Sequence, residues 1–214
     1  MIDDVIDEPE TLRELKTNAR RQLRARYQGL RAAFPLTARA ERSQRIIERV
    51  VELEVYTAAR SLGLFWPFGA EVDLRPLDER ARAEQKKVFY PVLDPTPEGT
   101  IRTGFAEACC VAELVERGRR FAEPPAEAPR AARGEIDLIL VPALAVTDDG
   151  HRLGYGRGFY DVTLPDFSPP AKSLIVAFDF QLLAELPVFE HDVACDLVVT
   201  DSRVIRVDRA RREP

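Results

Sequence analysis

The chain has 214 residues, 45% of them hydrophobic and 31% charged, which is the composition of an ordinary globular protein. Its length favours a single domain over residues 1–214 with a substantial hydrophobic core. A net charge of −5 argues against a nucleic-acid-binding protein, because such proteins carry an excess of Lys and Arg. No apolar run is long enough to cross a bilayer, and the acidic start lacks the pattern of a secretory signal. We therefore expect a cytoplasmic monomer without membrane or nucleic-acid partners.

The three cysteines, Cys109, Cys110 and Cys195, are too few for a disulfide framework and lack the spacing of metal ligands. The adjacent pair is open to two interpretations, a redox-active pair or small apolar residues of the core. Free cysteine most often behaves as a small buried hydrophobe, so we expect core positions.

An acidic tip, residues 1–9, is expected to be disordered. A helix is predicted from Pro9 to about Arg31, where apolar residues recur every three or four positions. Beside this apolar stripe runs a basic one. Like charges four residues apart repel in an isolated helix, so the basic stripe is either solvated or faces an anion. The basic residues are Arg13, Lys16, Arg20 and Arg24.

Pro35 ends this helix, and Thr37 is the expected N-cap of a second helix that runs to about Leu53. Short apolar runs then alternate with helical patterns. Runs such as D-L-I-L-V-P are typical of interior parallel strands, so we expect an open α/β sheet with its site at the carboxyl ends of the strands. The expected strands are Arg60–Phe65, Lys87–Val92, Asp137–Pro142, Leu174–Phe178 and Asp196–Thr200. The further expected helices are Leu74–Gln85, part of Val111–Arg117, Phe159–Leu164 and Phe180–Glu185.

Proline-rich composition predicts loops at Asp94–Thr100 and Glu123–Arg133, the second of them on the surface. The last residues, 207–214, are expected to form a frayed tail.

The segment Gly150–Asp161, G-H-R-L-G-Y-G-R-G-F-Y-D, is the most informative part of the chain. Glycines at alternate positions leave backbone N–H groups accessible and allow dihedrals that other residues avoid. Flanked by Arg152 and Arg157, these groups suit phosphate oxygens, and the carboxylate of Asp161 suits Mg²⁺. The spacing matches neither a P-loop nor the dinucleotide fingerprint. The alternatives are a phosphate-binding turn and a tight strand-to-helix connection.

A second mixed segment, F-W-P-F-G-A-E-V-D-L-R-P-L, spans Phe65–Leu77. Its aromatic rings and carboxylates suit a flat heteroaromatic ligand with N–H donors. Trp66 is either a ligand contact or a core residue, and Glu71 is likewise open to a functional and a structural role. For Asp73 we favour a helix cap.

Near the last expected strand, His191 and Asp192 follow a glutamate. We interpret His191 as a solvated loop residue, and Asp192 as a second Mg²⁺ ligand if the fold brings it to Asp161. A covalent nucleophile is not indicated, because there is no G-x-S-x-G motif and no plausible Cys–His pair. The pattern favours phosphoryl transfer, which depends on positioning and charge.

Taken together, these segments resemble the 5-formyltetrahydrofolate cyclo-ligase family, also called 5,10-methenyltetrahydrofolate synthetase. The resemblance includes K-x-x-x-R at Lys16 and Arg20, the segment Phe65–Leu77, the block that ends in Gly150–Asp161, and L-P-V-F-E-H-D-V-A-C-D-L-V-V-T. It implies an open α/β sheet, mostly parallel, of the ribose-5-phosphate isomerase and CoA-transferase type, with an N-terminal helical pair.

The resemblance also implies an ATP- and Mg²⁺-dependent cyclisation of 5-formyltetrahydrofolate to 5,10-methenyltetrahydrofolate, with release of ADP and phosphate after phosphorylation of the formyl oxygen. By position, Lys16, Arg152 and Tyr160 would be catalytic. The metal ligands would be Asp161 and Asp192. The folate would be bound by Trp66, Glu71, Tyr155 and Tyr160. ATP would be bound by Lys16, Arg20, Arg152, Gly154, Tyr155, Gly156, Arg157, Gly158, Phe159 and Tyr160.

The chain departs from the family pattern at several positions. Ala19 replaces a leucine, a tryptophan common in a strand region near Thr103–Ala108 is missing, and Arg157 replaces a frequent glycine. Two alternatives to the enzyme are a non-catalytic folate- or nucleotide-binding relative and an RNA-binding protein. The retained phosphate-site residues argue against the first, and the acidic net charge disfavours the second.

Overall fold

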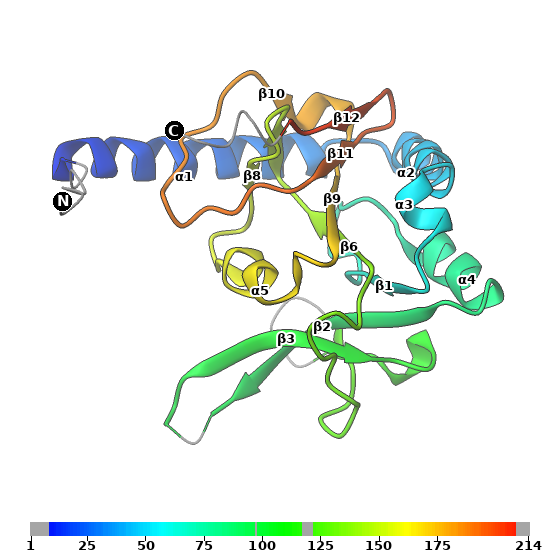
Figure 1. The fold of residues 1–214 in the computed structure, drawn as a ribbon. Coiled ribbons are helices and arrows are strands. Elements are labelled where there is room, and N and C mark those ends of the chain that lie inside the picture. Colours follow the sequence, from blue (N-terminus) through cyan, green and yellow to red (C-terminus); the bar gives the residue numbers. More distant parts are fainter. Residues whose placement is uncertain (1–8, 97, 117–121, 209–214) are drawn as a thin grey trace.

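The structure is a computed structural model that describes residues 9–96, 98–116 and 122–208. Its centre is a seven-stranded sheet flanked by helices (Figure 1), which confirms the expected open α/β architecture. The strand order is β12-β11-β9-β6-β1-β2-β3; neighbours from β11 to β2 are parallel, and the two edge strands are antiparallel. The strands are β1 (Ser61–Gly63), β2 (Lys87–Pro95), β3 (Ile101–Glu107), β6 (Leu138–Pro142), β9 (Lys172–Val176), β11 (Leu197–Val199) and β12 (Val204–Arg206).

The central strands are covered on both faces because their sequences are apolar at successive positions. In β6, Leu138 and Leu140 belong to the core on one face of the sheet, and Ile139 and Val141 belong to the core on the other. All four are fully buried. Successive side chains of a strand point to opposite faces, so a continuous apolar run needs cover on both sides. This confirms the interpretation of D-L-I-L-V-P as an interior parallel strand.

Helices supply this cover. α2 and α4 contribute to the core on one face, and α5 contributes to the core on the other. The expected N-terminal pair is present as α1 and α2, but the predicted N-cap at Thr37 is wrong. The residue before α2 is Pro35, with φ −56° and no side-chain cap; its ring fixes the backbone at the helix entrance. The helices are α1 (Glu10–Ala32), α2 (Leu36–Val51), α3 (Glu54–Thr57), α4 (Arg75–Ala83) and α5 (Phe159–Phe167).

The long helix α1 packs against a small three-stranded sheet instead of the main one. Tyr27 forms a buried cluster with Leu144, Ala145 and Leu153, and Leu23 packs against it. Figure 1 shows α1 as a long rod whose C-terminal half lies beside this small sheet. The contact places the polar face of α1 next to the glycine-rich segment. The small sheet has the order β10 (Leu182–Leu183), β7 (Ala145–Thr147) and β8 (Arg152–Leu153).

Two predicted helices are wrong. The segment from Phe180 forms a 3₁₀ turn, Asp179–Gln181, followed by β10, because the buried Gln181 amide donates to the carbonyls of Ala143 and Leu144 and holds the chain against the small sheet. The segment from Val111 forms only a 3₁₀ turn. It is followed by a two-stranded pair, β4 (Val115–Glu116) and β5 (Ala122–Glu123).

The loops also differ from expectation. Only Asp94 and Pro95 of the predicted loop Asp94–Thr100 belong to a strand, since β2 continues to Pro95 and pairs with β3. Hydrogen bonds between Thr96 and Thr100 close the turn. The segment Glu123–Arg133, predicted to lie on the surface, begins with a buried residue. Glu123 is 2% exposed, and its carboxylate accepts the N–H of Leu93. Edge pairings of this kind have little apolar signal in the sequence.

Of the cysteines, Cys195 is buried as expected, but Cys109 and Cys110 are exposed, so the core interpretation is wrong for the adjacent pair. Residues 1–8 of the expected acidic tip and 209–214 of the expected tail lie outside the described residues. Val207, the first residue of the expected tail, is hydrogen-bonded to the chain, since its N–H donates to the carbonyl of Asp196. Within the described ranges, no helix has the length and apolarity to span a membrane.

The turn at Gly150, between β7 and β8, has no room for a side chain. Its φ is +86°, and a Cβ atom there would lie 2.5 Å from the carbonyl oxygen of Cys195. Gly150→Ala is expected to lower the free energy of unfolding by roughly 2 kcal/mol or more, because backbone strain and the clash act together. Urea denaturation measures the change.

Gly154→Ala is the matched control for this prediction. A Cβ atom at Gly154 would meet no atom within 4 Å, and the φ of this residue is outside the left-handed region. The free energy of unfolding of Gly154→Ala should therefore stay within about 0.5 kcal/mol of the unsubstituted protein. Equal losses in the two variants would contradict the account of the turn.

Candidate active site

A cavity of about 520 Å³ opens between α1, the glycine-rich segment, the segment after β1 and the loop before β11. This volume is in the range of small-molecule sites. Pro142 ends β6, and Phe65 and Trp66 follow β1, so part of the lining lies at carboxyl ends of parallel strands. This agrees with the location expected for an open α/β sheet.

The glycine-rich segment forms one wall of the cavity. After β8 the chain bends through residues 154–158 and enters α5. Gly156 has φ +91° and Gly158 has φ +66°, the second as the N-cap of α5. Both lie in the left-handed region, as expected for positions that avoid side chains. The first N–H groups of α5 have no partners within the helix, so the bend and the helix start present donors on one side.

Arg24 holds this bend and was not among the predicted site residues. Its Nε donates to the carbonyl of Gly154 over 3.0 Å, and a Cβ atom at Gly156 would lie 3.3 Å from its Cζ. Burial and the nearby Arg20 cation lower the pKa of Arg24. The sequence signal was present, because Arg24 lies one helical turn after Arg20 in the basic stripe, but only the docking of α1 shows which stripe residues meet the bend.

Arg20 is buried in an ion pair with Asp192. The Arg20 Nη1 donates to Oδ2 of Asp192 over 2.6 Å, and the two side chains are 9% and 8% exposed. Of the two alternatives for the basic stripe, the solvated one is therefore wrong at Arg20. Lys16 takes a different place: its Nζ donates to the carbonyl of Val188 over 2.9 Å and lies 5.8 Å from the ring centre of Phe189.

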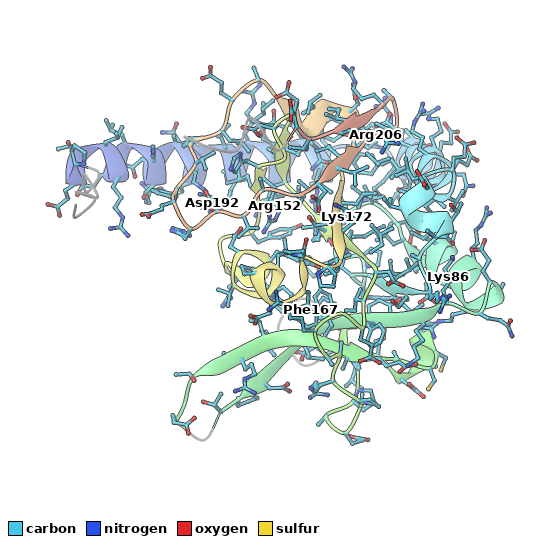
Figure 2. The ribbon with its side chains drawn as sticks, in the orientation of Figure 1. Lys86, Arg152, Phe167, Lys172, Asp192 and Arg206 are labelled. Atoms are coloured by element: carbon cyan, nitrogen blue, oxygen red, sulfur yellow. The ribbon has the colours of Figure 1, made fainter. Side chains whose placement is uncertain are left out.

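A second ion pair crosses the site. Arg152 Nη2 donates to Oδ1 of Asp161 over 2.7 Å, and Arg152 Nη1 donates to the carbonyl of Val193. The Arg152 side chain is only 4% exposed. Figure 2 labels Arg152 and Asp192, which come from β8 and from the loop before β11 and lie along the same flank of α1. Asp161 and Asp192 are thus each paired with an arginine.

The predicted metal ligands fit a magnesium ion held jointly by protein and ligand. Asp161 uses Oδ1 for Arg152 and the Val193 N–H, and Asp192 uses Oδ2 for Arg20 and the Phe189 N–H. The second oxygen of each carboxylate takes no part in these contacts. Among the described residues, no cluster of three His, Cys, Asp or Glu side chains forms a metal cage. Two carboxylates with phosphate oxygens and water suit Mg²⁺, which is seldom held by protein ligands alone.

The other end of the cavity is aromatic and carries one carboxylate. Glu71 is 8% exposed, and its Oε2 accepts the N–H of Phe68 over 2.9 Å. Burial raises the pKa of Glu71, and the N–H of Phe68, the Arg31 cation and a hydrogen bond with Tyr155 act against this rise. Trp66 lines the same end and packs edge-to-face near Tyr90, 6.5 Å between ring centres. Trp66 thus packs against the core, as one of its two expected roles requires, and also lines the cavity; its contact with a ligand stays a prediction.

Two further residues of the Phe65–Leu77 and Glu190–Asp192 segments have simpler roles. The predicted helix cap at Asp73 is wrong, because Leu74 is the N-cap of α4 and has no side-chain cap. Asp73 instead accepts the N–H of Arg75, the first residue of α4, and pairs with its guanidinium. His191 is exposed on its loop as expected, but it also lines the cavity and stacks on Phe189, with 5.6 Å between ring centres and 7° between planes. The solvated-loop interpretation of His191 therefore misses this contact.

Tyr160 carries a buried polar atom that the protein leaves without a partner. Its hydroxyl finds no hydrogen-bond partner among the described residues, although the ring contacts Phe159 and the Arg152 guanidinium. Burial and the Glu71 carboxylate raise the pKa of Tyr160 above its ordinary value, so the hydroxyl keeps its proton. Buried polar groups normally have partners. A cavity-lining hydroxyl of this kind fits a site whose missing partner is a ligand atom.

Nearly all predicted site residues meet in this one cavity. Lys16 is the exception, since it lies on α1 beside the cavity and is not part of the lining. The basic stripe contains a signal for Arg24, but the sequence has none for Arg31, whose cation, in the last turn of α1, opposes the rise that burial causes in the pKa of Glu71. The predicted residues in the lining are Arg20, Trp66, Glu71, Arg152, Gly154, Tyr155, Gly156, Arg157, Gly158, Phe159, Tyr160, Asp161 and Asp192.

Fold and cavity together define an α/β protein with cations around a glycine bend at one end of its site and aromatic rings around a buried carboxylate at the other. Comparison with known proteins identifies its family. Residues 16–201 match the 5-formyltetrahydrofolate cyclo-ligase family. The chain therefore belongs to this enzyme family, and the resemblance found in the sequence is confirmed.

Individual relatives agree with this assignment. The chain is 31% identical over 176 residues to 5-formyltetrahydrofolate cyclo-ligase of Escherichia coli (strain K12), covering 81% of this chain and 96% of that protein. The cyclo-ligase of Mycolicibacterium smegmatis is 49% identical over 82 residues, covering 38% of this chain and 42% of that protein. The NMR structure of Aquifex aeolicus 5,10-methenyltetrahydrofolate synthetase is similar with a TM-score of 0.75 at 27% identity, covering 88% and 92% of the two chains.

The buried pair between Arg20 and Asp192 has a consequence for stability. Arg20→Met leaves the Asp192 carboxylate buried without its cation, so the free energy of unfolding should fall by about 3 kcal/mol. Adding Asp192→Asn removes the unpaired charge and should restore part of the loss. Urea denaturation of the single and double variants measures both effects.

Arg21→Met on the same helix is the control, because Arg21 is exposed and its guanidinium hydrogen-bonds Asn18, one turn away on α1. It should change stability by no more than about 0.5 kcal/mol. If Arg20→Met costs no more than Arg21→Met, the pair does not contribute as described.

Proposed function

We propose that this protein closes the ring of 5-formyltetrahydrofolate to give 5,10-methenyltetrahydrofolate, with ATP as the phosphoryl donor and Mg²⁺ as the metal. Membership of the cyclo-ligase family supports the reaction. The observation that carries the ATP assignment is the convergence of α1 cations on the glycine bend in one cavity. Accessible backbone amides and several guanidinium groups together suit a polyphosphate.

In the proposed reaction the formyl oxygen attacks the γ-phosphorus, and the bond to the bridging oxygen breaks to release ADP. The formyl carbon, now bonded to a phosphorylated oxygen, is attacked by N10 of the folate. The carbon–oxygen bond then breaks, its electron pair leaves with phosphate, and N10 loses its proton. Phosphorylation thus converts a poor leaving group into a good one. Such a transfer depends on positioning and on cations near the phosphoryl oxygens.

At the nucleotide end, Arg20, Arg24 and Arg152 would contact phosphate oxygens together with the backbone of the glycine bend. Arg157 is exposed at the cavity rim and adds a further cation where phosphates enter. Lys16 lies beside this group on α1, with its Nζ at the carbonyl of Val188. In this proposal Lys16 leaves that carbonyl to reach the terminal phosphate.

Asp161 and Asp192 would bind Mg²⁺ through the oxygens that their arginine pairs leave unused. Bound there, the metal would neutralise phosphate charge and favour attack at phosphorus. The arginines paired with these carboxylates, Arg152 and Arg20, would then turn towards the phosphate oxygens. Each arginine and each carboxylate would thus have an opposite charge nearby both before and after the ligand binds.

At the folate end, Trp66 would pack against the fused ring system, and Glu71 would accept hydrogen bonds from its N–H groups. Tyr155 belongs to the glycine bend and hydrogen-bonds Glu71, so it links the two ends. The Tyr160 hydroxyl, which has no hydrogen-bond partner in the described part of the chain, would donate to the formyl or phosphoryl oxygen.

A spectroscopic assay tests the proposal directly. The protein is incubated with 5-formyltetrahydrofolate, ATP and Mg²⁺, and the near-ultraviolet absorbance of the methenyl product is followed. Growth of this absorbance that requires ATP is the expected result. Trp66 is the single tryptophan of the chain and lines the cavity, so quenching of its fluorescence reports folate binding without turnover. Binding without product would favour the non-catalytic relative. The absence of both product and binding would overturn the proposal.

The proposed metal role makes a sharper prediction. Asp161→Asn should raise the Mg²⁺ concentration needed for half-maximal rate by roughly tenfold or more, because a neutral amide is a poor ligand for Mg²⁺. Initial rates across a Mg²⁺ titration at fixed ATP measure this shift.

Asp166→Asn is the matched control, since Asp166 is an exposed residue of the same helix α5. It should leave the Mg²⁺ dependence unchanged. If Asp161→Asn lowers the rate equally at every Mg²⁺ concentration, the carboxylate serves only to hold Arg152, and the metal assignment is wrong.

A further inference from the structure

Arg31 is a buried cation just outside the cavity, in the last turn of α1. Arg31 as a whole residue is only 4% exposed. Nη2 donates to the hydroxyl of Tyr155, Nη1 donates to the carbonyl of Ala143, and the guanidinium lies 5.6 Å from the Tyr155 ring centre. Burying a guanidinium is costly unless it has a charged or strongly polar partner. Both of its hydrogen bonds are to neutral oxygens, so its compensating charge must lie one step further away.

That charge is the Glu71 carboxylate. Tyr155 receives a hydrogen bond from Arg31 and shares one with Glu71, which forms a chain from guanidinium through phenol to carboxylate. The groups that face Glu71 are the Arg31 cation, the hydroxyls of Tyr155 and Tyr160, and the N–H of Phe68. Of these groups, only the Arg31 guanidinium is positively charged near neutral pH, because an arginine is not deprotonated in proteins.

We propose that Arg31 is a positioning residue for the folate site, which acts through Tyr155 to keep Glu71 an ionised, correctly oriented acceptor for the N–H groups of the folate ring. The inference rests on the proposed function, since it assigns Glu71 to the folate. Arg31 itself does not line the cavity and does not touch the substrate.

The chemistry of the carboxyl group explains why its charge matters. An ionised carboxylate accepts hydrogen bonds through both oxygens, whereas a protonated one presents a donor in place of an acceptor. Burial raises the pKa of Glu71 and so favours the protonated form, while Arg31 and Tyr155 oppose this effect. Without Arg31 the pKa of Glu71 would rise further, so a larger fraction of the carboxyl group would be protonated and unable to accept.

Arg31→Met tests this inference through the pH dependence of folate binding, measured by quenching of Trp66 fluorescence without ATP. At neutral pH the dissociation constant for 5-formyltetrahydrofolate should rise by roughly tenfold for each unit by which the pKa of Glu71 passes the assay pH. Binding should recover at alkaline pH, as Glu71 ionises. Arg26→Met, an exposed arginine of the same helix, should bind as the unsubstituted protein does at every pH. A loss that is the same at all pH values would overturn the inference.

The stability of Arg31→Met should change with pH in the direction opposite to that of folate binding. The raised pKa of Glu71 in the folded Arg31→Met protein means that the folded state binds more protons than the unfolded state. The melting temperature should therefore fall as pH rises through the interval up to that pKa, and level off above it. A merely structural defect would not make binding improve while stability declines over the same pH range.

Two more variants separate the chain of hydrogen bonds from the charge alone. Tyr155→Phe removes the connecting hydroxyl and should shift the pH dependence in the same direction as Arg31→Met, and the two changes together should cost less than the sum of their separate effects. Arg31→Lys keeps the positive charge and should restore most binding at neutral pH. If Arg31→Met does not fold, these two variants carry the test, and an unchanged pH profile in Tyr155→Phe would overturn the inference.

A measurement without substrate distinguishes failure of this inference from failure of the proposed function. Infrared spectra of Arg31→Met should show the carbonyl stretch of a protonated carboxyl group at neutral pH, and the band should disappear when Glu71→Gln is added. If the band appears but no variant, nor the unsubstituted protein, binds folate, the proposed function is wrong while Arg31 still sets the ionisation of Glu71. If folate binds but the band is absent, only the role of Arg31 is wrong.

Discussion

The packing of α1 on the small sheet determines where the cations of the cavity lie. Tyr27 is buried against Leu144 and Leu153, and this apolar contact fixes both the position of the helix and its rotation about its axis. Residues three or four apart share one face of a helix, so Arg20 and Arg24 reach the glycine bend together. The repulsion expected within the basic stripe is offset by partners on other elements. The apolar stripe therefore has a structural consequence, because it directs two residues of the basic stripe, Arg20 and Arg24, into the cavity.

Arginines held this close together need opposite charges when no anion is bound. Asp192 neutralises Arg20, and Asp161 neutralises Arg152. Pairs of this kind keep the guanidinium groups ordered and partly desolvated, which strengthens any later charge-assisted hydrogen bond. A nucleotide phosphate with its metal carries charges of both signs. In the proposed function it would therefore take over both partners of a pair: the arginines would bind the phosphate oxygens and the carboxylates would hold the metal, so no buried charge would be left unpaired.

The sequence predicts those parts of the fold whose signal is local. The central strands are continuous apolar runs, and α1 has a long regular stripe, so both were predicted. The strand β3 and the two-residue strand β10 were not predicted. β3 pairs with β2 at the edge of the main sheet and begins with exposed residues, so it lacks a continuous apolar run. The chain before β10 is held by hydrogen bonds from Gln181 to Ala143 and Leu144, which are distant in the sequence. The site follows the same rule. Its glycine bend is recognisable from composition, whereas the roles of Arg24 and Arg31 follow only from how α1 docks.

The ionisation of the two tyrosines limits what they can do in the proposed reaction. Burial and the Glu71 charge raise the pKa of Tyr155 to about 12 and also raise that of Tyr160. Both phenols therefore stay protonated near neutral pH, and each can donate a hydrogen bond but cannot act as the base that takes a proton from N10. In the proposed reaction their role would be to orient oxygen atoms of the substrate. The proton of N10 would then leave to the departing phosphate or to water, so the proposed ring closure would need arranged donors and cations more than a dedicated general base.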